Sequence, residues 1–124
     1  MRVEASLREL AELGDAIINF VASAALTMRE GRPRGVRVPD KLLRRAAARS
    51  GLGGWLDYGP EDLFEAAAAY AWLANRVTLE RMVRVVLEGM GSEGLEGGLA
   101  ALAGLLRDCY RELIERAGGL RPGA

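Results

Sequence analysis

Apolar residues recur at every third or fourth position over most of this chain, and that period predicts amphipathic helices. The first helix is expected to begin at Leu7 and to end near Arg29, before Gly31. Ser6 can cap it, because Glu9 follows at the spacing of a capping box. Its apolar positions are Leu7, Leu10, Leu13, Ile17, Phe20, Val21, Ala24 and Ala25.

Further helices are predicted after two prolines and one threonine. Pro39 opens the second helix, and Pro60 opens the third, where Glu61 and Asp62 complement the positive end of the helix dipole. The third helix is almost entirely alanine and aromatic residues, so most of its surface should be buried. Thr78 can cap the fourth. The predicted ranges are 40–49, 60–73, 79–87 and 99–117, with a loop over 55–59.

No stretch predicts a convincing strand and no repeat is evident, so the expected fold class is all-α. The 124 residues correspond to one domain. We expect a core over residues 5–88, a flexible linker over 89–98, an extra C-terminal helix over 99–117 and a loose tail over 118–124. Along that last helix a narrow apolar seam belongs either to the core or to a dimer surface. Its members are Leu99, Leu102, Leu106, Cys109 and Leu113.

Composition narrows the chemistry. Seventeen basic and seventeen acidic residues give a net charge of zero, and half of the residues are hydrophobic. The sequence contains no histidine, which excludes histidine general acid/base catalysis and histidine-bound zinc. Its single cysteine is expected to be buried. The longest apolar run, 16–28, is too short to span a bilayer and no signal peptide is evident, so we expect a cytoplasmic protein without membrane contact.

Two acidic pairs lie in segments that otherwise resemble core. Glu12 and Asp15 are three positions apart in the first helix, and so are Asp62 and Glu65 in the third. That spacing places both carboxylates of a pair on one helix face, where like charges repel. A cation between the two helices would convert this repulsion into attraction. The alternative for the second pair is simply favourable placement at a helix N-terminus.

The residues around these acids resemble the ribonuclease III family. The run Leu-Gly-Asp-Ala at 13–16 is similar to the family's signature helix, and Asp-Leu-Phe-Glu-Ala at 62–66 is similar to its second acidic motif. Between them, residues 38–56 are similar to a family helix that ends in a Gly-Leu-Gly turn. The resemblance covers about residues 7–87. In its small size and expected lack of a double-stranded-RNA-binding domain, the chain resembles the mini and archaeal types of the family.

This resemblance implies a homodimeric endonuclease that binds Mg²⁺ or Mn²⁺ and cleaves double-stranded or structured RNA. Asp15, Asp62 and Glu65 match the family's metal-site positions. The sequence departs from the family at Ala11, where a glutamate is usual, and at Glu12, where an aromatic residue is usual. Glu12 still faces roughly the same way as Asp15, so we include it as a candidate fourth ligand.

A basic segment follows the first helix. Residues 29–49 contain eight basic and two acidic side chains, an excess that is either a phosphate-binding surface or a solvated one. A-form RNA is contacted through its backbone and 2′-hydroxyls, which arginines can reach. The expected RNA-binding residues are Arg29, Arg32, Arg34, Arg37, Lys41, Arg44 and Arg45. The preference for arginine over lysine is compatible with a thermophile or with a GC-rich genome.

Three functions remain open on the sequence. The first is a metal-dependent endoribonuclease, and the second is a non-catalytic relative with a degraded metal site that binds RNA or ribosomes. The third is a helical assembly protein. The run Gly-Met-Gly-Ser-Glu-Gly at 89–94 has the letters of a dinucleotide-binding motif, but no strand precedes it. We therefore expect no nucleotide cofactor.

Overall fold

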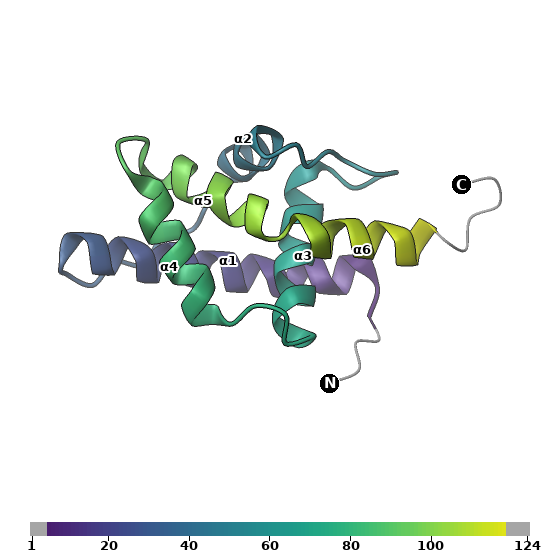
Figure 1. Ribbon diagram of the computed structural model, residues 1–124, viewed down its shortest axis with the longest axis horizontal. Coiled ribbons are helices and arrows are strands. Elements are labelled where there is room, and N and C mark those ends of the chain that lie inside the picture. The colour runs from purple at the N-terminus through teal and green to yellow at the C-terminus, as the bar shows by residue number, and fades with distance from the viewer. Residues whose placement is uncertain (1–4, 119–124) are drawn as a thin grey trace.

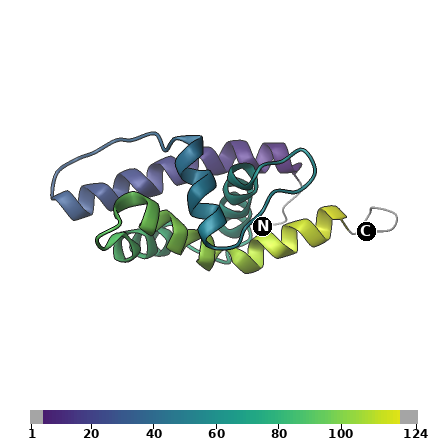
Figure 2. The ribbon, with the colours of Figure 1, turned by 90° about the horizontal axis from the view of Figure 1, so that it is seen from above.

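The computed structural model of the chain describes residues 5–118, and within that range it is built from six helices. Helix α1 runs along the long axis of the molecule, and α5 and α6 follow one another along the opposite side (Figures 1 and 2). Helix α3 stands between them and crosses both. The bounds are α1 Leu7–Glu30, α2 Asp40–Arg49, α3 Pro60–Leu73, α4 Leu79–Met90, α5 Gly94–Leu105 and α6 Arg107–Gly118.

The all-α prediction is confirmed: β pairing in the described part of the chain is limited to one isolated bridge, between Trp55 and Tyr58. The expected starts of the first four helices are also confirmed. Ser6 and Glu9 form the capping box, and Gly31 ends α1 with a left-handed φ of 72°. By length and composition α1 could cross a membrane. In this structure its apolar face instead packs against α3 and α4, so it acts as the central core helix.

Helices α1 and α3 approach each other most closely at Gly14. A Cβ atom built at this position would lie 1.8 Å from the backbone oxygen of Glu65, so no larger residue fits without moving a helix. The alanines at 66–69 of α3 are buried, and their small side chains extend this close contact along the helix. The contact places Asp15, the next residue after Gly14, beside the acidic start of α3.

The predicted linker over 89–98 is wrong. Helix α4 continues to Met90 and α5 begins at Gly94, which leaves only a short turn between them. The glycines of this segment serve close packing instead of flexibility. A Cβ atom on Gly98 would lie 2.4 Å from the backbone oxygen of Val86, and one on Gly89 would lie 2.6 Å from the Cβ of Ala101. These glycines allow α4 and α5 to pack backbone against backbone.

The predicted single helix over 99–117 is also wrong, because α5 ends at Leu105 and α6 begins at Arg107. The apolar seam nevertheless belongs to the core: Leu99, Leu102 and Leu106 are fully buried, and Cys109 and Leu113 nearly so. The dimer-surface alternative is therefore wrong for these residues. Burial raises the pKa of the Cys109 thiol, in agreement with the expected core cysteine. Of the predicted tail, residues 119–124 lie outside the described range.

Replacing Gly14 tests the contact between α1 and α3. We expect Gly14→Ala to lower the free energy of unfolding by at least about 2 kcal/mol, because the added methyl group overlaps the backbone of α3. Urea denaturation measures this. The matched control is Gly104→Ala in α5, where the nearest atom to the added Cβ is 3.8 Å away. A similar stability loss in both variants would contradict a specific contact at Gly14.

Candidate active site

A cavity of about 520 Å³ opens where the first half of α1 meets the start of α2, the loop before α3 and the start of α3. All four acids predicted from the sequence line it, so the structure brings residues from two distant segments together. Six carboxylates and two guanidinium groups surround the space. The lining residues are Arg8, Ala11, Glu12, Asp15, Arg37, Asp40, Asp57, Tyr58, Asp62 and Glu65.

Glu65 is the most unusual of these side chains. It is only 6% exposed, and among residues 5–118 it is the one charged side chain that is buried. Burial, followed by the neighbouring carboxylate of Asp15, raises the pKa of Glu65 to about 8. Asp40 and Asp62 raise it further. At neutral pH the Glu65 carboxyl therefore keeps a proton, whose place a bound cation could take. Strongly shifted pKa values of this kind are common at functional sites.

The start of α3 orients its acids differently. The backbone N–H of Gly59 donates to Oδ2 of Asp62 at 3.0 Å, which occupies one of the two carboxylate oxygens. Glu61 forms an ion pair with Arg44, with 2.7 Å between Nη2 and Oε2, and this pairing lowers the pKa of the Glu61 carboxyl. Glu61 is thus neutralised from outside the cavity. Asp62 and Glu65 remain the acids that α3 presents to it.

Oxygen ligands of this kind suit a hard divalent cation such as Mg²⁺. Within the described residues, however, no three acidic side chains lie close enough together to hold one ion. Mg²⁺ usually keeps several waters and binds through one or two carboxylates, so the adjacent Asp15 and Glu65 fit its needs without a complete protein cage. The buried carboxylate of Glu65, next to the partly exposed carboxylate of Asp15, is the observation that favours a cation here.

Several lining residues were not predicted. Asp40 stands in the first turn of α2, where the helix dipole is enough to explain an acidic residue. Asp57 lies in a loop, where no helical periodicity indicates which way a side chain faces. Arg8 stands one helical turn before Glu12, a spacing that could have placed it on the same face. Ala11 and Glu12 both line the cavity. Glu12 therefore brings a carboxylate to this space from the position that follows Ala11, where the family usually has its glutamate.

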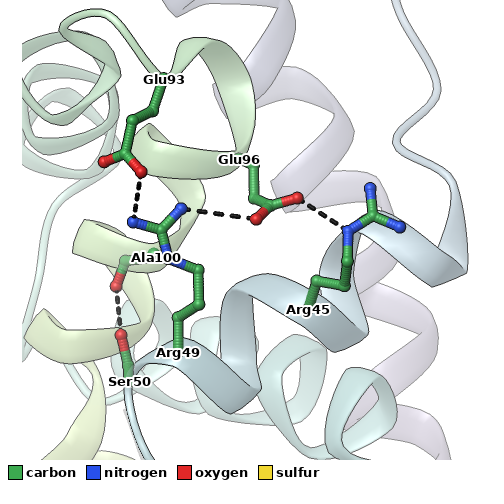
Figure 3. A network of polar contacts seen from close by, with 6 residues as sticks. All are labelled: Arg45, Arg49, Ser50, Glu93, Glu96 and Ala100. Atoms are coloured by element: carbon green, nitrogen blue, oxygen red, sulfur yellow. Dashed lines mark hydrogen bonds and ion pairs between the residues drawn. The ribbon is translucent and has the colours of Figure 1, made fainter.

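Most of the predicted RNA-binding cations are engaged within the chain. Arg34 pairs with Glu30, Arg44 with Glu61, and Arg29 donates to the backbone oxygen of Gly91. Figure 3 shows Arg45 bound to Glu96 of α5. The neighbouring Arg49 is bound to Glu96 and to Glu93, the residue before α5. Arg37 is the one predicted cation that lines the cavity. Arg32 and Lys41 are exposed, and neither forms an ion pair within residues 5–118.

Comparison with known families agrees with this geometry. A family model described as Ribonuclease III matches residues 8–107. The chain belongs to the ribonuclease III family. This match includes both acidic segments and extends through α4 and α5, beyond the resemblance seen in the sequence. The family acts on RNA and generally uses a divalent metal. A search of curated proteins finds no match.

The raised pKa of Glu65 predicts how stability depends on pH in this ribonuclease III-like domain. Between about pH 4.5 and pH 8 the folded chain retains a proton that the unfolded chain releases, so the free energy of unfolding should fall as pH rises and then level off. Since one pKa unit corresponds to about 1.4 kcal/mol, the loss from Glu65 should exceed about 1 kcal/mol. Urea denaturation in a chelator at pH 5–8.5 measures it.

Glu65→Gln should remove this part of the pH dependence and make the chain more stable than wild type at pH 8. The control is Glu115→Gln, which changes an exposed acid on α6 and should retain the wild-type slope. An unchanged slope in Glu65→Gln would show that the pH dependence arises elsewhere.

Proposed function

We propose that this chain is a metal-dependent endoribonuclease that cleaves phosphodiester bonds in double-stranded or structured RNA. The observation that carries the proposal is the buried carboxylate of Glu65, which faces the cavity beside Asp15 and has a pKa of about 8. Burial is the main cause of this raised pKa, followed by the carboxylate of Asp15, and a divalent cation would offset both by compensating the charge of the ionised acids. Membership in the ribonuclease III family supplies the substrate class.

Each acid has a distinct task in this proposal. Asp15 and Glu65 would hold Mg²⁺ or Mn²⁺ directly. Asp62, whose Oδ2 accepts from the N–H of Gly59, would hold it through one of the waters that Mg²⁺ usually keeps. Glu12 stands at the exposed side of the cavity and is the candidate fourth ligand. When bound, the metal lowers the pKa of a water and stabilises the leaving oxygen.

Arg37 is the best candidate for contact with the phosphate being cut, because it reaches the same cavity as the acids. Its positive charge can offset the repulsion between a phosphodiester and the carboxylates around it. Arg32 and Lys41 would contact the RNA backbone farther from the cut, and their exposure before and within α2 supports this role. Arg29, Arg34, Arg44 and Arg45 would have to exchange their present partners to bind RNA.

The decisive experiment is cleavage of a duplex RNA in Mg²⁺ or Mn²⁺. Asp15→Asn and Glu65→Gln should each reduce the cleavage rate by at least about 100-fold, because even outer-shell partners of a metal cost 10- to 100-fold when removed. Asp108→Asn is the control, since this carboxylate is 88% exposed on α6. Glu65→Gln should fold at least as well as wild type, so lost cleavage cannot be attributed to unfolding.

The non-catalytic alternative is favoured by one departure, Ala11 in place of the family's glutamate. A binding module would retard duplex RNA in a gel with a steep salt dependence, yet neither metal would produce cleavage. A helical assembly protein would show neither binding nor cleavage. The same assay therefore separates the three functions.

We also propose that the active form is a homodimer. Phe20 and Met28 of α1 are 54% and 62% exposed, and they line an apolar groove of about 470 Å³ against α4. Along α4 the charges of the groove alternate, with Glu80, Arg84 and Glu88 four positions apart. Two antiparallel copies of α4 can therefore place each Glu80 opposite the Arg84 of the other copy. A two-fold dimer also matches the antiparallel strands of a duplex.

Phe20→Glu should convert this dimer into a monomer, because it places a charge in the apolar groove. Sedimentation equilibrium at micromolar concentration measures the mass. Arg81→Glu is the control, since Arg81 is exposed on α4 but does not line the groove. A monomeric wild type would refute the proposal, and so would a Phe20→Glu variant that stays dimeric.

A further inference from the structure

The loop between α2 and α3 ends in a tight turn beside the acidic cavity. Trp55 and Tyr58 exchange two backbone hydrogen bonds, of 2.9 and 3.0 Å, which leaves Leu56 and Asp57 at the tip. Asp57 and Tyr58 line the cavity. Figure 2 shows this loop extending away from the helices between the end of α2 and the start of α3. The tip is therefore placed where a large substrate would approach the acids.

Leu56 adopts a conformation that leucine normally avoids. Its φ is +55°, in the left-handed region, where a Cβ atom crowds the following carbonyl oxygen. Turns of this kind usually carry glycine or asparagine at such a position. Among the described residues, Asn75 is the other non-glycine with positive φ, at +57°, and asparagine tolerates it well. Leu56 alone combines this strain with a bulky apolar side chain.

Burial does not compensate for this strain. The Leu56 side chain is 63% exposed, so it contributes little to the core. Strained residues of this kind cluster at functional sites, where the surrounding structure enforces them. A leucine that is both strained and exposed is better explained by a contact made outside the chain than by folding.

The base of the loop is held firmly by the C-terminal helices. Arg107 donates to the backbone oxygen of Ser50 at 2.8 Å, and the Tyr110 hydroxyl donates to that of Gly53. Ser50 donates in turn to the backbone oxygen of Ala100 in α5, as Figure 3 shows. Because these contacts fix the part of the loop that leads to the tip, the tip can present its side chain at little entropic cost on binding.

We propose that Leu56 contacts the substrate and packs against ribose in the minor groove of duplex RNA while the cut strand lies in the cavity. This inference rests on the proposed nuclease function. The A-form minor groove is wide and shallow and displays sugar surfaces, which an apolar side chain can cover. An uncharged contact also suits this place, since the cavity beside it contains six carboxylates that repel phosphate.

The test uses steady-state cleavage of a duplex RNA by the full chain. Leu56→Gly removes both the strain and the side chain, and Leu56→Asn keeps a residue that suits the turn while removing the apolar surface. Both should raise KM about tenfold, as expected for losing part of a buried leucine contact, with kcat within about twofold of wild type. Both should also melt at or above the wild-type temperature, because the left-handed strain is reduced.

Asn75→Gly is the matched control, because it changes the other positive-φ residue at the far end of α3 and should leave KM unchanged. Leu56→Met keeps an apolar side chain and should retain most of the wild-type KM. An unchanged KM in Leu56→Asn, or a fall in kcat alone, would overturn the role of Leu56 while leaving the nuclease intact. A wild type that neither cuts nor binds the duplex would instead refute the proposed function, and this inference with it.

Discussion

The close approach of α1 and α3 at Gly14 is the constraint on which the rest of the site depends. With no side chain at this position, the backbone of α1 lies directly against the backbone of Glu65. The residue after Gly14 is an aspartate, so the same contact that packs the core also brings two carboxylates together. The close packing of α1 against α3 and the proximity of the Asp15 and Glu65 carboxylates thus both depend on Gly14. The chain accepts a buried acid with a pKa of about 8 as a result.

The zero net charge of the chain conceals an uneven distribution. Carboxylates gather around the cavity, whereas most arginines of the 29–49 segment are paired with acids elsewhere on the chain. The pairs between α2 and α5 are largely exposed, and each contributes about 0–1 kcal/mol. Their more important effect is that Arg45 and Arg49, being bound to acids of the chain, are not free to bind phosphate. Arg37 is left beside the acids.

The C-terminal helices support the cavity without contributing a residue to it. Helix α6 is fixed to α3 through Glu112, which accepts from the Tyr70 hydroxyl at 2.6 Å and pairs with Arg76. The same helix holds the loop that carries Asp57 and Tyr58, through Arg107 and Tyr110. The sequence predicted an extra C-terminal helix beyond the core. In the structure, α6 instead helps to position one wall of the site.

The sequence by itself determined where the first four helices begin and which faces the acids share, because both depend on neighbours within about four positions. The capping box at Ser6, the start of α2 after Pro39 and the shared face of Glu12 and Asp15 all follow from such local rules. Only the tertiary structure decided which distant residues meet. Asp40, Asp57 and Arg37 reach the cavity, Arg45 is bound to α5, and the glycines at 89–98 pack two helices together. Those outcomes depend on contacts between residues far apart in the chain, for which a local pattern carries no signal.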